Sequence, residues 1–247
     1  MNIQNNKQLE FAGKLFFPQR CRFCNRVIKF CETMCKHCRE TLNPIDGDIC
    51  FLCGHKKCDC ICKNHKSFYD AVVAPYYYNG AGGTAVRKMK FNKVPFIEES
   101  LINDMAACFN AHYKNYYFDF ICYVPMTKRS QKRRGFNQSQ ILAEGLSRVT
   151  GIPLFDVLVK LHETETQHEI PGFLRSGNVR GVFDINETFS DKLTDARVLL
   201  IDDIKTTGST LNECAVTLKI NGASEVFCLT ATITQKQEKP KLPDQSE

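Results

Sequence analysis

The sequence contains no apolar run of about 18 residues, the length that a membrane-spanning helix requires. Its first 17 residues, MNIQNNKQLEFAGKLFF, have neither a long hydrophobic core nor a cleavage site of small residues, so they do not predict a secretory signal. No internal repeat is present. We therefore expect a cytoplasmic protein with no membrane span and no repeat architecture.

The composition is that of a chain with a packed core. The 247 residues are 43% hydrophobic and 24% charged, which is room for one α/β domain of ordinary size and a small accessory unit. The net charge of +6 is local, because residues 1–66 hold 12 Lys and Arg against 6 Asp and Glu while the rest is balanced. This surplus is a mild indication of a nucleic-acid or other anionic partner, and metal-bound thiolates would cancel part of it.

Cysteine is abundant: the chain has 14, and ten of them lie between Cys21 and Cys62. Without a signal peptide, such clustering indicates metal binding rather than disulfides. Two CxxC pairs about a dozen residues apart supply four thiolates on tight turns, which is typical of a tetrahedral zinc site. A short segment with little apolar content also needs such a metal to fold. Cys31 lies between the pairs and is expected to be spare, so the predicted ligands are Cys21, Cys24, Cys35 and Cys38.

A third pair, Cys50 and Cys53, predicts a second zinc site, so that the chain would hold one to two structural zinc ions. In the sequence CDCIC that follows, we favour Cys60 and Cys62 as its partners and leave Cys58 spare. The alternative is that these cysteines are reduced free thiols in a loop. This alternative explains the first set of four cysteines poorly and is acceptable for the second set. The remaining cysteines stand in apolar segments and are expected to be buried core thiols: Cys108, Cys122, Cys214 and Cys228.

Strand and helix patterns alternate from Phe68 onward, which predicts an α/β fold with a parallel sheet flanked by helices. Loops at the C-terminal ends of the strands should then form one crevice. We divide the chain into a cysteine-rich zinc-binding unit at 1–66, an α/β domain at 67–234 and a disordered tail at 235–247. The expected strands lie at 69–80 (with a turn), 118–124, 198–201 and 226–233, and the expected helices at 82–91, 98–113, 137–149 and 211–220.

One stretch, VLLIDDIKTTGST at 198–210, combines a strand, an acidic pair and a hydroxyl-rich turn. Four apolar residues predict a buried strand, and Asp202 and Asp203 follow at its end. The turn leads into a helix, whose N-terminal N–H groups and dipole can hold a phosphate. The carboxylates suit the vicinal hydroxyls of a sugar or a magnesium shell. The candidate phosphate-binding residues are Thr206, Thr207, Gly208, Ser209 and Thr210.

The alternative for this stretch is an ordinary Asp-rich turn with Ser/Thr caps, which we would prefer for the acidic pair alone but not for the whole combination. Lys205, inside the stretch, either favours the phosphate or points to solvent.

A basic segment at 125–138, PMTKRSQKRRGFNQ, directly follows an expected strand and contains no acidic residue. A loop of this kind suits a pyrophosphate or a nucleic-acid backbone, and the alternative is a solvated surface loop. The long polar stretch at 160–181 lacks periodicity, which in a compact domain is typical of a lid over a site. The basic candidates are Lys128, Arg129, Lys132, Arg133 and Arg134.

The stretch at 198–210 resembles the 5-phosphoribosyl-1-pyrophosphate (PRPP) motif of type I phosphoribosyltransferases. The resemblance implies that Asp202 and Asp203 hold the ribose 2′ and 3′ hydroxyls and that the turn at 206–210 holds the 5′-phosphate. The cysteine pairs, KMKF, VPMTKRSQKRRGFNQ, TETQ and RSGNVRG precede it in this order. From about 17 to 233 the chain thus resembles the ComF family of competence-related proteins, also called amidophosphoribosyltransferase-like.

The family resemblance implies a type I phosphoribosyltransferase fold behind a zinc-ribbon-like N-terminal unit. It places the segment 125–138 on the pyrophosphate side and makes 160–181 the mobile loop. A glutaminase half is not expected, because position 2 holds no cysteine and no such domain is recognisable.

Our hypothesis is a PRPP-binding, magnesium-dependent phosphoribosyltransferase-like protein of the ComF type that acts in natural competence and DNA uptake. A transferase of this kind would be a glycosyltransferase, but the sequence assigns neither a catalytic residue nor an acceptor. The rival hypothesis is a zinc-ribbon module that binds single-stranded DNA and whose transferase site is vestigial or only senses PRPP. The partners implied are PRPP, single-stranded DNA and a DNA-uptake or helicase protein.

Overall fold

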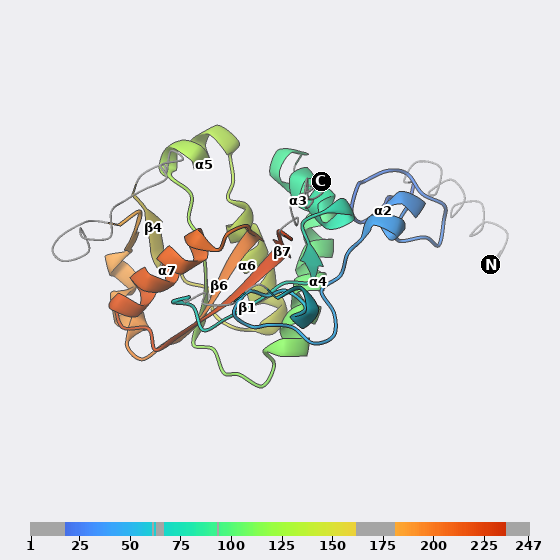
Figure 1. Cartoon of the computed structure of the whole chain (residues 1–247). Coiled ribbons are helices and arrows are strands. Elements are labelled where there is room, and N and C mark those ends of the chain that lie inside the picture. Colours follow the sequence, from blue (N-terminus) through green and yellow to red (C-terminus); the bar gives the residue numbers. More distant parts are fainter. Residues whose placement is uncertain (1–17, 61, 63–66, 93, 162–180, 236–247) are drawn as a thin grey trace, which may run out of the picture.

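The structure, a computed structural model, describes residues 18–60, 62, 67–92, 94–161 and 181–235 (Figure 1). Three expectations lie outside these residues. They are the packing of the N-terminal apolar residues on the body, the conformation of most of the 160–181 stretch, and disorder of the tail beyond 235.

A parallel sheet forms the centre of the molecule, as the alternating pattern predicts. Its strand order is β1-β7-β6-β3, and the short β2 pairs with β7 beyond the end of β1. The long strands are buried along nearly their whole length and are largely apolar, as expected when helices cover both faces of a sheet. The strand bounds are β1 Ala71–Val73, β2 Tyr76–Tyr77, β3 Phe120–Tyr123, β6 Arg197–Lys205 and β7 Glu225–Ile233.

Helices cover the two faces unequally (Figure 1). Helix α4 packs on α3, on α6 and on β7, so these three helices form one layer, whereas α7 packs with β5 on the other face. Strands β4 (Leu158–Lys160) and β5 (Phe183–Ile185) form a separate antiparallel pair. The helices are α3 Gly80–Asn92, α4 Pro95–His112, α5 Lys128–Arg134, α6 Gln138–Thr150, α7 Ser209–Ile220 and the 3₁₀ helix η2 Glu187–Leu193.

The cysteine-rich segment consists of two knuckles that pack on different parts of the domain. We call residues 20–42 the distal knuckle; it contains α2 (Lys36–Thr41) and lies beside α3. We call residues 43–62 the proximal knuckle; it contains the 3₁₀ helix η1 (Lys57–Asp59) and follows the β1 edge of the sheet, where the Val72 N–H donates to the Phe51 carbonyl at 2.7 Å. Within the described residues, no helix is long and apolar enough to span a bilayer.

Three elements differ from the sequence-based expectations. Strand β6 continues past the apolar run, through the acidic pair, to Lys205, because it stays paired with β7 as far as Ile233. The basic segment contains a helix, α5, rather than a loop. The apolar pattern of 137–149 predicts Val149 on the inward face of α6, but its side chain is exposed.

Candidate functional site

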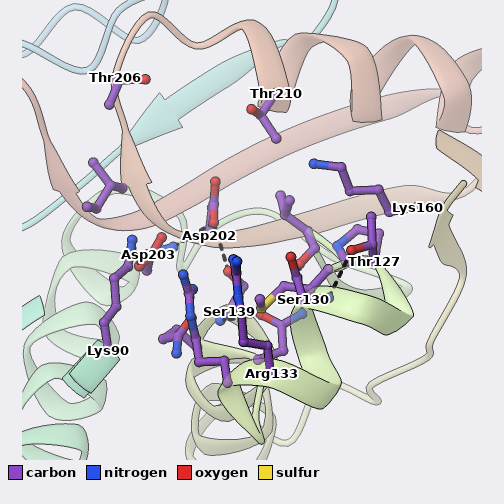
Figure 2. A pocket seen from close by; sticks show the side chains of 17 residues that line it. Lys90, Thr127, Ser130, Arg133, Ser139, Lys160, Asp202, Asp203, Thr206 and Thr210 are labelled. Atoms are coloured by element: carbon purple, nitrogen blue, oxygen red, sulfur yellow. Dashed lines mark hydrogen bonds and ion pairs between the residues drawn. The ribbon is translucent and has the colours of Figure 1, made fainter. Parts of the chain in front are cut away.

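The pocket lies at the C-terminal ends of β3 and β6, which are neighbours in the sheet. After β3 the chain continues to α6, and after β6 it continues to α7, on the opposite face. In parallel α/β sheets, ligands bind at such a topological switch point. The cavity has a volume of about 470 Å³, and polar or charged side chains from β6, α3, α5, α6 and β4 line it (Figure 2).

The acidic pair forms the floor of this pocket. Asp202 and Asp203 are each only 8% exposed, although an acidic pair after an apolar run predicts an exposed strand end. They are covered because β6 continues beyond them and because the first turn of α6 and the end of α3 contact their carboxylates. Oδ1 of Asp202 accepts hydrogen bonds from the Ser139 hydroxyl and from the Asp203 amide, both at 2.8 Å (Figure 2).

Burial raises the pKa of Asp202 to about 7, and the negative charge of Asp203 adds to the rise. The hydrogen bonds from Ser139 and from the Asp203 amide, together with the positive charge of Lys90, act in the opposite direction. The charge of Asp202 therefore changes near neutral pH, close to where a ligand would bind.

Lys90 brings a positive charge to the acidic pair from helix α3. Its Nζ lies 2.5 Å from Oδ2 of Asp203, and both side chains are mostly buried (Figure 2). Our sequence analysis noted the KMKF motif but did not assign Lys90 to the site. The KMKF motif contains Lys90, but the local sequence does not show which strand of the sheet the last turn of α3 will contact.

The hydroxyl-rich turn closes the opposite side of the pocket. Gly208 has a φ of 87°, a left-handed conformation that favours glycine, and α7 starts at the next residue. The Ser209 N–H donates to the Thr207 hydroxyl at 3.3 Å, and the two hydroxyl oxygens lie 2.9 Å apart. Of the five turn residues that we predicted, Thr206 and Thr210 line the cavity; Thr207 and Ser209 are exposed outside its lining, and Gly208 is buried.

Lys205, just before the turn, is only 5% exposed. This excludes the alternative in which its ammonium group points to solvent. A Cβ built on Gly208 would stand 3.2 Å from Cε and 3.7 Å from Nζ of Lys205, so the lysine lies against the turn.

Helix α5 divides the five predicted basic residues into two groups. Arg133 and Arg134 line the cavity together with Ser130, whereas Lys128, Arg129 and Lys132 are exposed outside it. The helix explains the division, because positions i, i+3 and i+4 share one face. Thr127 caps the helix by accepting from the Ser130 N–H at 3.1 Å.

The first turn of α6 forms the remaining wall. Nη1 of Arg134 donates to Oε1 of Gln138 at 2.9 Å, and Nδ2 of Asn137 donates to the Val124 carbonyl at 3.0 Å. Lys160 reaches the cavity from β4 (Figure 2). Arg134 was among the predicted basic residues, whereas Asn137, Gln138 and Lys160 had no assigned role, although the RGFNQ sequence contains the first two of these. The predicted lid stretch begins just after Lys160, and its residues 162–180 lie outside the described part of the chain.

The cysteines form two separate tetrads within the described residues. In each tetrad the four Sγ atoms lie within 4.8 Å of one another. Individual Sγ–Sγ distances are 3.6 Å between Cys24 and Cys35 and 3.8 Å between Cys50 and Cys62. Four thiolates about 2.3 Å from a tetrahedral zinc ion would stand about 3.8 Å apart, so both sets can hold structural zinc. The tetrads are Cys21, Cys24, Cys35 and Cys38, and Cys50, Cys53, Cys60 and Cys62.

The other cysteines take no part in these tetrads. Cys31 and Cys58 are exposed, as expected for spare thiols, and all 14 cysteines are free. The remaining four are buried, as the apolar character of their segments predicts. Burial raises the pKa of Cys108 to about 12, so that thiol stays protonated in the core.

Residues 132–246 match the phosphoribosyl transferase domain family. Competence protein F of Haemophilus influenzae is 27% identical over 232 residues, which cover 92% of this chain and 96% of that protein. Competence protein ComFC of Bacillus subtilis is 28% identical over 200 residues, with coverages of 76% and 79%. These similarities agree with the resemblance to the ComF family that the sequence motifs indicate.

Two more similarities concern parts of the chain. The DNA utilization protein YhgH of Escherichia coli K12 is 35% identical over 118 residues, about half of each protein. A solved structure of the glutamine PRPP amidotransferase of B. subtilis matches with a TM-score of 0.40 and 22% identity, over 54% of this chain and 26% of that chain.

The phosphoribosyl transferase domain match and the observed sheet agree with the fold class predicted from sequence: a phosphoribosyltransferase-like parallel sheet flanked by helices. The domain match starts at residue 132, within α5, and includes the acidic pair and the turn. The two cysteine tetrads precede it.

Proposed function

We propose that this ComF-like chain binds PRPP with magnesium in the pocket between β3 and β6 and acts in natural competence and DNA uptake. One observation carries the proposal. The acidic pair, the hydroxyl turn before α7 and two arginines of α5 line the same cavity at the topological switch point. PRPP needs three such surfaces, one each for its ribose diol, its 5′-phosphate and its pyrophosphate.

Each surface fits one part of the ligand. The carboxylates of Asp202 and Asp203 would accept from the ribose hydroxyls, with Lys90 sharing the charge of Asp203. The turn at 206–210 and the N-terminus of α7 would hold the 5′-phosphate. Arg133 and Arg134 would face the pyrophosphate, where guanidinium groups bind phosphate oxygens through paired N–H donors.

Magnesium is a hard cation that prefers oxygen ligands, and the two carboxylates of the pocket suit it. Bound with PRPP, it would neutralise charge that develops on the leaving pyrophosphate. The arginines and Lys160 add positive charge from this chain's own residues. A phosphoribosyl transfer would use the same groups, and release of pyrophosphate from PRPP with a nucleobase or single-stranded DNA as acceptor would establish it.

We also propose a cytoplasmic location, because two tetrads of free thiols are suited to a reducing compartment. The division at residue 66 between a zinc-binding unit and the transferase-like domain stays a prediction.

Titration calorimetry of PRPP with magnesium tests the proposal. Asp202→Asn and Asp203→Asn should each weaken binding by about 10- to 150-fold, since a hydrogen bond to a charged group contributes about 1.5–3 kcal/mol. Asp191→Asn, an exposed aspartate of η2, is the matched control and should bind PRPP like the wild type. Equal affinities in the wild type and in the Asp202/Asp203 double variant would refute the site.

The pH dependence of binding separates Asp202 from the other groups. Because its pKa is raised to about 7, the carboxyl is mostly protonated at pH 6 and mostly ionised at pH 8. The ionised form accepts better from a diol, so PRPP affinity should rise over this range. The phosphates of PRPP also titrate, and their effect on affinity should be the same in Asp202→Asn. The variant should lose the part of the affinity increase that comes from ionisation of Asp202. Above pH 7 the variant should also be no less stable, because a raised pKa means that the charged carboxylate costs folding free energy there.

The distal knuckle favours a second function, binding of single-stranded DNA. Five cations of this knuckle are exposed, and so are the side chains of Val27 and Phe30. Basic grooves with exposed aromatic rings bind single strands through phosphate contacts and base stacking. Arg22, which our sequence analysis grouped with these cations, instead forms an ion pair with Asp104 of α4 and is 28% exposed. The exposed cations are Arg20, Arg26, Lys29, Lys36 and Arg39.

A further inference from the structure

The turn that would hold the 5′-phosphate rests on a tyrosine from outside its own strand–turn–helix unit. A Cβ built on Gly208 would stand 3.4 Å from the hydroxyl oxygen of Tyr69, which precedes β1. Tyr69 is only 4% exposed, so its ring is fixed by packing. The hydroxyl therefore lies against the turn, and Tyr69 itself is not part of the cavity lining.

The same hydroxyl contacts the proximal knuckle. It donates to the Leu52 carbonyl at 3.1 Å. Leu52 lies inside the tight turn between Cys50 and Cys53, in which the Gly54 N–H donates to the Cys50 carbonyl at 2.7 Å. Burial raises the pKa of Tyr69 well above its usual value, so the hydroxyl keeps its proton and remains a donor. One side chain thus connects two ligands of the proximal tetrad with the phosphate turn.

A second contact joins the same two regions. The Phe68 N–H donates to Oδ1 of Asn212 at 2.7 Å, and Asn212 lies in the first turn of α7. The chain that leaves the proximal knuckle is therefore attached both to the turn and to the helix that follows it.

The proximal knuckle is itself held firmly on the sheet. A Cβ on Gly54 would come within 2.3 Å of Cδ1 of Ile233, so the backbone of the knuckle touches the end of β7. The ring of buried His55 lies between two carbonyls, with Nδ1 3.2 Å from that of Cys53 and Nε2 3.3 Å from that of Thr234. The Thr234 N–H also donates to the Lys205 carbonyl at 2.8 Å. Lys205 is the last residue of the neighbouring strand β6 and directly precedes the phosphate turn.

We propose that Tyr69 is a positioning residue for the phosphate turn, and that metal in the proximal tetrad holds the turn in its binding conformation through Leu52 and Tyr69. Loss of that metal frees the Cys50–Cys53 turn, and the Leu52 carbonyl no longer fixes Tyr69 against Gly208. The distal tetrad has no such route, because its described contacts run to α3, α4 and Tyr76. This inference rests on the PRPP site proposed above and assigns the proximal zinc a role in it.

The first test removes only the Tyr69 hydroxyl. In zinc-loaded full-length protein, Tyr69→Phe should make the amides of 206–212 exchange faster by roughly 2- to 12-fold, the effect of one neutral hydrogen bond. Affinity for ribose 5-phosphate should fall by a similar factor, while affinity for inorganic pyrophosphate should not change. A merely structural role would not separate the two ligands. Tyr117→Phe, which changes an exposed tyrosine outside the knuckles and the turn, is the control. It should change neither the exchange of the amides of 206–212 nor the affinity for ribose 5-phosphate.

The second test removes one zinc at a time. Well below its unfolding midpoint, Cys53→Ser should increase exchange at 206–212 and weaken ribose 5-phosphate binding. Cys24→Ser, which disables the distal tetrad, should leave both at wild-type values. If Cys53→Ser fails to fold, the Tyr69→Phe measurements decide.

Three results separate this inference from the proposed function. Wild-type exchange and ribose 5-phosphate affinity in Tyr69→Phe would overturn the inference while leaving the PRPP site in place. An equal loss of order at the turn in Cys24→Ser would also overturn it. Faster exchange in Tyr69→Phe, together with no binding of ribose 5-phosphate by the wild type, would support the connection and refute the PRPP site.

Discussion

Each of the two cysteine tetrads has four thiols and begins with a CxxC pair, yet the two lie in different surroundings. The proximal knuckle shares hydrogen bonds with β1, with the segment after β7 and with Tyr69. The distal knuckle contacts the domain through the Arg22–Asp104 ion pair and the edge of the Phe23 ring on Tyr76, and most of its cations face solvent.

The difference shows that ligand spacing predicts a metal site but not what the metal stabilises. A structural metal contributes folding free energy to whatever its loops are packed against. For the proximal tetrad that is the β1 edge of the sheet and Tyr69, and for the distal tetrad it is the surface of α3 and α4. The predictions below test this contrast, from the largest expected effect to the smallest.

Loss of a ligand should have unequal effects in the two tetrads. Cys53→Ser should lower the unfolding midpoint of the whole domain by roughly 10 °C or more, because several kcal/mol are lost and each shifts a domain of this size by about 2–4 °C. Cys24→Ser should unfold only the distal knuckle and leave the main transition in place. Differential scanning calorimetry, with elemental analysis for zinc, checks both. Equal midpoints for the two variants would contradict the contrast.

The close approach of the proximal knuckle to β7 can be tested with two glycines. Gly54 and Gly47 have positive φ values of 76° and 74°, but a Cβ would clash with Ile233 only at Gly54. Gly47→Ala should cost about 1 kcal/mol from backbone strain. Gly54→Ala should cost about 1–3 kcal/mol more because it overpacks this part of the interface. Denaturant unfolding measures the difference, and equal losses would mean that the knuckle can move off β7.

The Arg22–Asp104 ion pair attaches the distal knuckle to α4, and its removal should have a smaller effect on stability. Arg22→Ala leaves Asp104 without its charged partner and should cost about 1–3 kcal/mol, seen as faster proteolysis or amide exchange of residues 20–42. PRPP affinity should stay unchanged. Arg26→Ala, at an exposed cation of the same knuckle, should leave the exchange as it is. A weaker affinity for PRPP in Arg22→Ala would show that the distal knuckle also reaches the pocket.

The smallest effect on stability should come from the cations themselves. Arg26→Ala with Lys29→Ala should change the free energy of unfolding by less than about 0.5 kcal/mol. If the knuckle binds single-stranded DNA, the slope of log affinity against log salt should become shallower by about 0.7 for each phosphate that is no longer neutralised. Fluorescence anisotropy with labelled DNA across a salt series measures it. No binding by the wild type at low salt would reject the DNA function.

The parts of the molecule that sequence analysis predicted are those whose residues are neighbours along the chain. Asp202, Asp203 and Thr206 lie in one strand–turn–helix unit, so the local pattern places them together. Our sequence analysis favoured Cys60 over Cys58, and the structure brings Cys60 together with Cys50 and Cys53.

Residues that join the pocket from afar could not be predicted in this way. Lys90, Ser139 and Lys160 come from α3, α6 and β4, and only tertiary packing brings them to the acidic pair. The burial of that pair was missed for the same reason, since its cover is Lys90 and Ser139. The helical conformation of the basic segment decided which arginines face the cavity, and we had expected a loop.

The most direct test of the account is a crystal structure of the zinc-loaded protein with PRPP and magnesium. We predict the 5′-phosphate against the turn at 206–210, the ribose hydroxyls on Asp202 and Asp203, and the pyrophosphate beside Arg133 and Arg134. PRPP bound elsewhere on the chain, with this pocket filled only by solvent, would contradict the account.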